Sequence, residues 1–423
     1  MSNKRINDTG NGSVRRDYAV IALVLQGGGA LGSYQAGVYE GLAEAGIHPN
    51  WVAGISIGSL NAAVIAGNPP EQRVERLRAF WEYICRQPWS PPLPHSWFFP
   101  PGFEWPDSWR TWINTLETTR AFIEGQNGLF LPRSWLSFAY PQAGPDAASF
   151  YDTRPLRATL ERFADFDRIN RADEMRVSVG AVNVETGNFR YFDNARERLR
   201  PEHFMASAAL PPGFPAIEID GKHYWDGGLV SNTPLLHVLT DQPRRDALIF
   251  QIDLWSASGP LPASLLEVAA RQKDIQYSSR TRLVTAYMEE QQQFRSILNK
   301  VLALVPESKR SDPAYRQARD AACDARRNVV HLIYRNRAFE GHTKDAEFSL
   351  LSLNDHWSSG LDDARSTLAH PEWLALPTAD HPFVTHDVHR RLDGAANNLD
   401  TQLPKGRRML SLATTSQRSK AAA

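Results

Sequence analysis

Apolar residues in the first part of the chain follow two alternating patterns. A short apolar run at residues 20–25 is followed by glycines and then by Ser33 to Gly46, where apolar residues recur at helical spacing. The order then repeats, because the apolar run of residues 51–55 leads through a sharp turn into the helical pattern of residues 57–67. Strand, helix, strand, helix is a βαβ unit, which predicts a parallel sheet with helices on both faces.

The rest of the chain predicts further elements of both kinds. Residues 71–87 favour an amphipathic helix, and two strands should form a hairpin around Thr186 and Gly187. Residues 88–112 are dense in proline and aromatic residues and predict no regular structure. Strands are expected at residues 174–184, 188–192, 222–225, 246–255 and 328–334, and helices within residues 263–325 and 344–368.

Composition and charge narrow the class of protein. The chain has 47 Lys and Arg residues against 47 Asp and Glu, so it offers no argument for a nucleic-acid surface. The two cysteines, Cys85 and Cys323, form no metal or redox motif, and we expect neither a metal nor a cofactor. The N-terminus has no apolar signal region and no apolar run is long enough to span a membrane. We therefore expect a cytoplasmic protein that could contact lipid peripherally; the sequence does not fix its oligomeric state.

A glycine loop follows the first predicted strand. Gly27, Gly29 and Gly32 have the spacing G-x-G-x-x-G, and Gly28 lies between the first two. Such a loop between a strand and a helix can bind the pyrophosphate of a dinucleotide, or its backbone N–H groups can stabilise an oxyanion. The loop alone does not decide between an oxidoreductase and a hydrolase.

The next motif favours a hydrolase. Gly54, Ser56 and Gly58 form G-x-S-x-G between a strand and a helix, the context of a nucleophile elbow. A serine that only caps the helix is the alternative interpretation. A dinucleotide site expects an acidic residue at the end of the second strand, and none occurs there. We therefore assign Ser56 as a nucleophile and the amides of Gly27 to Gly29 as its oxyanion hole.

Two residues are candidates for the base that activates this serine. His331, in a later strand, would fit the order of a Ser-Asp-His triad, although a histidine buried in a strand is often structural. Asp226 precedes Gly227 and Gly228, which leave room beside its carboxylate, but Asp-Gly-Gly is also a common turn.

Three segments together resemble the patatin-like phospholipases. They are GGGALG, GISIG and ASAALPPGFPAIEIDGKHYWDGGLVSNTPL, and the resemblance spans residues 18–255. It implies a three-layer α/β/α sandwich and a Ser-Asp dyad without a catalytic histidine. Ser56 would be the nucleophile and Asp226 the base that cleaves lipid or phospholipid acyl esters. A carboxylate with its ordinary pKa of about 4 is a weak base. Burial would raise that pKa, so we expect Asp226 to be poorly solvated.

One residue departs from the family pattern. The family commonly has Arg or Lys just before the last glycine of its loop, where this chain has Leu31. The backbone N–H groups are unaffected. A cation that could place the loop or bind an anionic head group is missing, however, so the pattern indicates ester hydrolysis more directly than a phospholipid substrate.

The resemblance also divides the chain. We expect a catalytic domain over residues 17–340 and a helical C-terminal extension over residues 341–392. Residues 1–16 and 393–423 are expected to be disordered. The aromatic residues of 89–112 suggest a lid or a peripheral membrane contact, with a loop packed on the core as the alternative.

Overall fold

The computed structural model describes residues 17–86, 106–134 and 144–387. Those up to His386 belong to one compact unit. The ends expected to be disordered, residues 1–16 and 393–423, lie outside the described residues, as does the aromatic segment up to Trp105.

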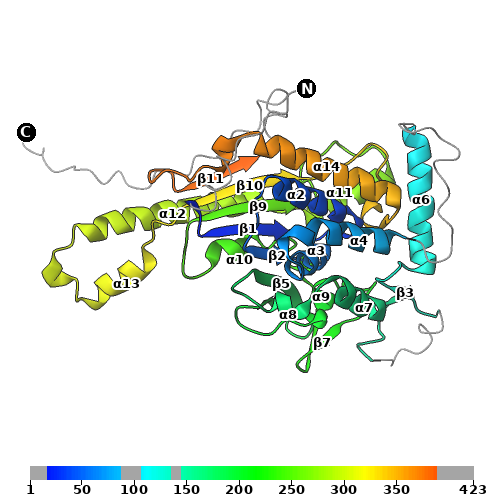
Figure 1. The fold of residues 1–423 in the computed structure, drawn as a ribbon, viewed down its shortest axis with the longest axis horizontal. Coiled ribbons are helices and arrows are strands. Elements are labelled where there is room, and N and C mark those ends of the chain that lie inside the picture. The colour runs from blue at the N-terminus through cyan, green and yellow to red at the C-terminus, as the bar shows by residue number, and fades with distance from the viewer. Residues whose placement is uncertain (1–16, 87–105, 135–143, 388–423) are drawn as a thin grey trace, which may run out of the picture. The chain divides into compact units, whose positions relative to one another are not determined.

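A nine-stranded sheet forms the middle of this unit (Figure 1). Its order is β11-β10-β9-β1-β2-β5-β8-β7, and β6 also pairs with β5. The neighbours from β10 to β5 are parallel, whereas β6 and β8 run antiparallel to β5 and β7 runs antiparallel to β8. The strands are β1 (Val20–Leu25), β2 (Trp51–Gly54), β5 (Arg176–Asn183), β6 (Phe189–Asp193), β7 (Ile217–Ile219), β8 (Lys222–Asp226), β9 (Ala247–Asp253), β10 (Arg327–Ile333) and β11 (Phe383–Asp387). A separate small sheet pairs β3 (Leu131–Pro132) with β4 (Tyr151–Asp152).

Helices cover both faces of the sheet. The helices of the described residues are α2 (Ser33–Glu44), α3 (Ile57–Ala66), α4 (Arg73–Cys85), α6 (Asp107–Glu124), α7 (Arg154–Phe163), α8 (Phe166–Ile169), α9 (Pro201–Ser207), α10 (Leu235–Thr240), α11 (Leu265–Tyr277), α12 (Thr281–Ala303), α13 (Pro313–Ala321) and α14 (Leu350–Leu368). Short 3₁₀ turns include η1 (Gly29–Gly32), η4 (Gly227–Leu229) and η6 (Lys344–Ala346).

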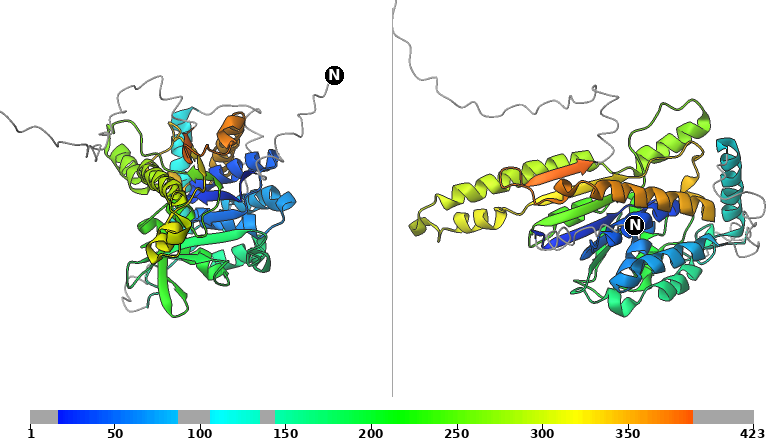
Figure 2. Two further views of the ribbon diagram at one scale, coloured as in Figure 1. Left: turned by 90° about the vertical axis from the view of Figure 1, so that its left-hand side faces the viewer. Right: turned by 45° about the horizontal axis from the view of Figure 1, so that its top comes forward.

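The side chains of β1 show why the fold has three layers. Leu23 and Leu25 pack in the larger core with α2, α3, α4 and α14, whereas Ala22 and Val24 pack in a second core with α10 and α12. In the left view of Figure 2 the blue helices α2 to α4 and the yellow-green α12 lie on opposite sides of the sheet. The predicted α/β/α sandwich with a mostly parallel sheet is therefore confirmed.

Most predicted elements are also confirmed, including the first two βα pairs and the hairpin of β5 and β6. The prediction of irregular structure up to residue 112 is wrong at its end. The helix α6 begins at Asp107, directly after Pro106. Proline is compatible with the start of a helix, and its density upstream hid the helical pattern that follows.

One feature of the sheet brings distant segments together. β2 pairs with Arg176–Val179 of β5, and β8 pairs with Ala181–Asn183 of the same strand. β6 occupies the other edge of β5, where it pairs with residues from both of these stretches. β2 and β8 must therefore share one edge of β5, and since they run in opposite directions their ends meet head to head. Gly54 ends β2 and Asp226 ends β8, so the residue after each strand lies at this junction.

The C-terminal helix α14 packs closely on α2. A Cβ added at Gly360 would lie 2.1 Å from the carbonyl oxygen of Tyr34, and one added at Gly37 would lie 2.0 Å from that of Trp357. Tyr34 also donates a hydrogen bond to Asp363 (2.7 Å). The two helices touch along their backbones, so residues beyond 340 are part of the same packed unit.

Candidate active site

Ser56 occupies a strained turn between β2 and α3. Its φ of 54° lies in the left-handed region, which non-glycine residues rarely adopt unless the surroundings hold them there. The Ser56 amide donates to both the carbonyl and the hydroxyl oxygen of Ser207 (3.1 Å each), and Ser59 donates to the Ser56 carbonyl (2.6 Å). These bonds fix the backbone, and the Ser56 side chain faces a cavity.

The glycines around the turn allow close backbone approach. A Cβ at Gly54 would lie 2.4 Å from the carbonyl oxygen of Gly58, and one at Gly58 would lie 2.5 Å from that of Leu25. The same holds for Gly32, which abuts Ile57, and for Gly227, which abuts Gly180.

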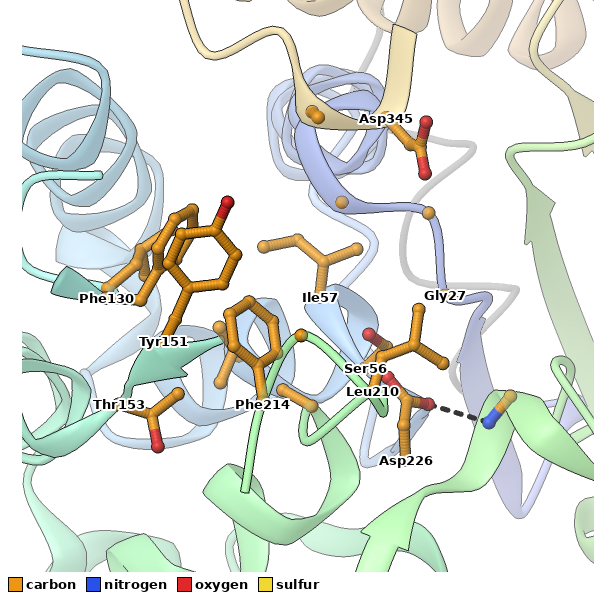
Figure 3. Close-up of a pocket in the computed structure, with 18 of the residues that line it drawn as sticks. Gly27, Ser56, Ile57, Phe130, Tyr151, Thr153, Leu210, Phe214, Asp226 and Asp345 are labelled. Carbon is orange, nitrogen blue, oxygen red and sulfur yellow. Dashed lines mark hydrogen bonds between the residues drawn. The ribbon is translucent and has the colours of Figure 1, made fainter. Parts of the chain in front are cut away.

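Asp226 lies beside Ser56 at the end of β8 (Figure 3). Its side chain accepts a hydrogen bond from the Gly228 amide (2.7 Å), and the Ser56 side chain lies close enough to lower the pKa of the carboxyl. The residue is 1% exposed, and this burial raises its pKa from 3.8 to about 7, although the nearby Ser56 side chain and the Gly228 amide lower it. The expectation of a poorly solvated Asp226 is confirmed.

The glycine loop lies against the same serine. A Cβ at Gly27 would lie 3.0 Å from the Cβ of Ser56. The Gly27 amide already donates to the Asn232 carbonyl (3.2 Å). In the part of the chain that the structure describes, the amides of Gly28 and Gly29 donate no hydrogen bond. Two of the three predicted oxyanion donors are therefore available to a ligand.

Asn232 and Trp255 orient the loop. Both donate to the carbonyl oxygen of Gly27, Asn232 through Nδ2 (3.0 Å) and Trp255 through Nε1 (2.8 Å). In a trans peptide the following N–H points opposite to the carbonyl, so the Gly28 N–H points away from these two side chains. The sequence reasoning did not identify either residue, because only the folded chain brings them to the loop.

The cavity next to Ser56 has a polar and an apolar end. Its volume is about 340 Å³. Gly27, Ser56 and Asp226 stand at one end, and aromatic side chains gather at the other (Figure 3). The apolar lining includes Leu60, Phe122, Leu129, Phe130, Tyr151, Leu156, Met205, Leu210 and Phe214. Such a wall fits a hydrocarbon chain.

The C-terminal region closes the cavity beside the glycine loop. Asp345, Ala346 and Phe348 line it, and a Cβ at Gly29 would lie 2.0 Å from the Asp345 carbonyl oxygen. The neighbouring Lys344 donates to Asp274 (2.6 Å), and its Nζ lies 4.8 Å from the ring centroid of Trp255. The extension thus braces the residues that orient the loop.

The other sequence candidates lie elsewhere. The imidazole Nε2 of His331 lies 2.6 Å from Asp253 on β9, and His331 does not line the cavity, so the structure contradicts a triad with this histidine. Leu31 is fully buried in the larger core. None of the described residues that line the cavity is Lys, Arg or His. No cluster of His, Cys, Asp and Glu among the described residues could hold a metal ion.

Comparisons with known proteins agree with the resemblance found in the sequence. Residues 23–239, more than half of the chain, match a family model described as patatin-like phospholipase. Residues 275–380 match a second one described as patatin phospholipase. No curated protein matches the chain.

Several solved structures are similar at low identity. VipD from Legionella pneumophila is 12% identical, with a TM-score of 0.35 over 87% of this chain and 72% of its own. Human GIVD cytosolic phospholipase A2 is 12% identical, with a TM-score of 0.37 over 85% of this chain and 60% of its own. ExoU from Pseudomonas aeruginosa, in complex with SpcU, is 15% identical, with a TM-score of 0.22 over 70% of this chain and 61% of the matched chain.

Proposed function

Since the chain belongs to the patatin-like phospholipase family, and is therefore a hydrolase of lipid acyl esters, we propose that it works through a dyad of Ser56 and Asp226. The observation that carries this proposal is the close approach of the Ser56 side chain to the buried Asp226 carboxylate (Figure 3). It joins a nucleophile to a base at the polar end of an apolar cavity, where none of the described lining residues is a histidine.

The reaction begins with proton transfer to Asp226. As the Ser56 oxygen attacks the ester carbonyl, its proton moves to the carboxylate, and the carbonyl oxygen becomes an oxyanion. The amides of Gly28 and Gly29 donate to this oxyanion, and the positive end of α3 adds a favourable field. Asp226 then returns the proton to the departing alcohol. A water molecule, activated in the same way, releases the fatty acid from Ser56.

The raised pKa of Asp226 explains why an aspartate can serve as the base. A solvated carboxylate, with a pKa near 4, takes up a proton too weakly to activate a serine well. A carboxyl with a pKa of about 7 is still half ionised at neutral pH and accepts the proton far more readily. The same group is then acidic enough to protonate the leaving alkoxide.

The cavity supports recognition of the acyl part of the substrate. Its apolar end can bury a hydrocarbon chain while the ester lies at Ser56. The described lining offers no cation to a phosphate, and the family's usual Arg or Lys is replaced by the buried Leu31. We therefore propose that the acyl chain contributes more to binding than the head group.

Labelling by a fluorophosphonate tests the dyad. The parent enzyme should be labelled at Ser56 and should hydrolyse acyl esters, and Ser56→Ala should lose both properties. His331→Gln is the matched control, because the dyad predicts that this variant keeps both labelling and hydrolysis. Full hydrolysis by folded Ser56→Ala, or loss of labelling in folded His331→Gln, would overturn the mechanism.

A further inference from the structure

The helix α6 has its apolar and polar faces reversed relative to a normal surface helix. Its inward side buries Arg110 and Thr118, and Arg110 pairs with Asp355. Its outward side carries an α6 face that we define as Trp109, Trp112, Leu116 and Ile123. Trp112 is 58% and Ile123 69% exposed. A helix normally turns its apolar stripe to the core, so this stripe indicates a partner other than water.

The start of the helix α11 carries further exposed apolar side chains. α6 and α11 lie side by side (Figures 1 and 2) and line a common cavity. Leu265, at the start of α11, is 86% exposed, and Leu261 and Leu266 are also exposed. Exposed apolar side chains therefore stand on two helices, on either side of this cavity.

The helix α6 also reaches the cavity of Ser56. Phe122 is half exposed near the end of α6, and its side chain also lines that cavity. Phe122 therefore gives an apolar connection between α6 and the apolar end of the cavity. This connection identifies the partner chemically, because the proposed substrate is a lipid ester.

We propose that the α6 face and the start of α11 dock the enzyme on the surface of a lipid bilayer, with Trp109 and Trp112 at the interface. The inference rests on the proposed function for the identity of the substrate. Tryptophan favours the boundary between hydrocarbon and water, and α6, about 27 Å long at 1.5 Å per residue, could lie flat in it. None of the helices in the described part of the chain could span a membrane.

The charges around this surface favour apolar insertion over attraction to anionic lipid. Three basic side chains of α6 and α11 are engaged within the protein. Arg110 pairs with Asp355, Arg120 with Glu124, and Arg271 donates to the carbonyl of Ser256. Binding should therefore occur on zwitterionic vesicles and should change little with salt, since screening acts on exposed charges.

Vesicle binding tests the proposal independently of catalysis. Full-length Ser56→Ala protein is sedimented with phosphatidylcholine vesicles, so that no substrate is consumed. The added substitutions Trp112→Gln and Leu116→Gln should weaken binding at least tenfold. The control is Ile297→Gln, whose side chain is 59% exposed on α12, a helix that extends away from α6 (Figure 1), and it should bind like its parent.

Activity provides the second readout. In the background with Ser56 intact, Trp112→Gln with Leu116→Gln should lower hydrolysis of an ester embedded in vesicles while leaving a soluble short-chain ester unaffected. Equal vesicle binding by parent and double variant, or no binding by either, would overturn the proposal. So would a double variant that changes the oligomeric state instead, because the face would then join two copies of the chain. Failure of the Ser56-Asp226 mechanism would appear in the labelling experiment and would not alter vesicle binding.

Discussion

Asp226 meets two opposing requirements. Its role as a base requires that it ionise. Its burial at the end of β8 removes the water that would stabilise the charged carboxylate. The Gly228 amide and the Ser56 hydroxyl recover only part of that stabilisation, because the pKa stays near 7. The residue that drives the proposed chemistry is therefore also a local source of instability.

Replacing Asp226 by Asn should abolish hydrolysis and stabilise the fold. The folded state keeps its proton up to about pH 7, whereas the unfolded chain loses it near 3.8, so the parent's stability falls as pH rises between these values. Asn cannot ionise and avoids this loss. We expect the variant's free energy of unfolding to exceed the parent's by roughly 2 kcal/mol or more at pH 8, with a smaller difference at pH 5.

Denaturant unfolding at both pH values measures this difference. Parallel pH dependences in parent and variant would show that Asp226 does not hold a raised pKa. The parent's kcat/KM should also rise with pH through about 7, because Asp226 must be ionised to accept the proton.

The sequence predicted part of the site. Ser56 was indicated by its position between a strand and a helix, and the structure places Asp226 and the glycine loop next to it. Asn232 and Trp255 could not be predicted, since their role depends on side-chain directions set by packing across more than two hundred residues. The hydrogen bond from the Gly27 amide to the Asn232 carbonyl could not be predicted either, because every residue has a backbone carbonyl.

At the scale of elements, the contact between α2 and α14 depends on glycine. An alanine within a helix is normally favoured over glycine by up to about 1 kcal/mol. At Gly360, however, its Cβ would lie 2.1 Å from the Tyr34 carbonyl oxygen, so one helix would have to move. The close approach also places Trp357 and Leu353 in the core shared with α2.

Gly360→Ala should therefore lower the free energy of unfolding by about 2 kcal/mol or more, as overpacked cores usually do. Thermal unfolding of the purified variant measures the loss. Gly341→Ala is the matched control, because a Cβ there meets nothing within 4 Å. Equal melting temperatures for the two variants would contradict a backbone contact between the helices.

Several strands that the sequence predicted have apolar runs. The runs that became β1, β9 and β10 are apolar enough to be recognised without their neighbours. The helix α6 was missed because its apolar residues follow an aromatic, proline-rich segment and face outward. The short strand β11 was missed because its pairing partner, β10, is distant in sequence.

At the scale of the whole molecule, the C-terminal region packs directly against the elements that form the candidate active site. The predicted boundary near residue 340 separates β10 from η6 and α14, yet Asp345 touches the glycine loop and α14 covers α2. Lys344 links this region to Trp255 and so to the carbonyl of Gly27.

Ending the chain after Glu340 should therefore abolish both folding and hydrolysis. The fragment would lose α14, β11 and one wall of the cavity, and it would expose the apolar face of α2. Soluble yield, thermal unfolding and fluorophosphonate labelling measure the outcome. A chain that ends after Asp387 is the control, since it keeps every described element. Labelling of the shorter fragment at the rate of the control would show that the catalytic unit ends near residue 340.

The head-to-head meeting of β2 and β8 has a consequence for protein synthesis. Ser56 leaves the ribosome 170 residues before Asp226, a delay of roughly 10–30 s at ordinary translation rates. Asp345, which closes the cavity beside the loop, emerges later still. Under the proposed mechanism, a nascent chain thus carries a serine with no base. The proposed hydrolase therefore becomes active only after the chain up to Asp345 has been made.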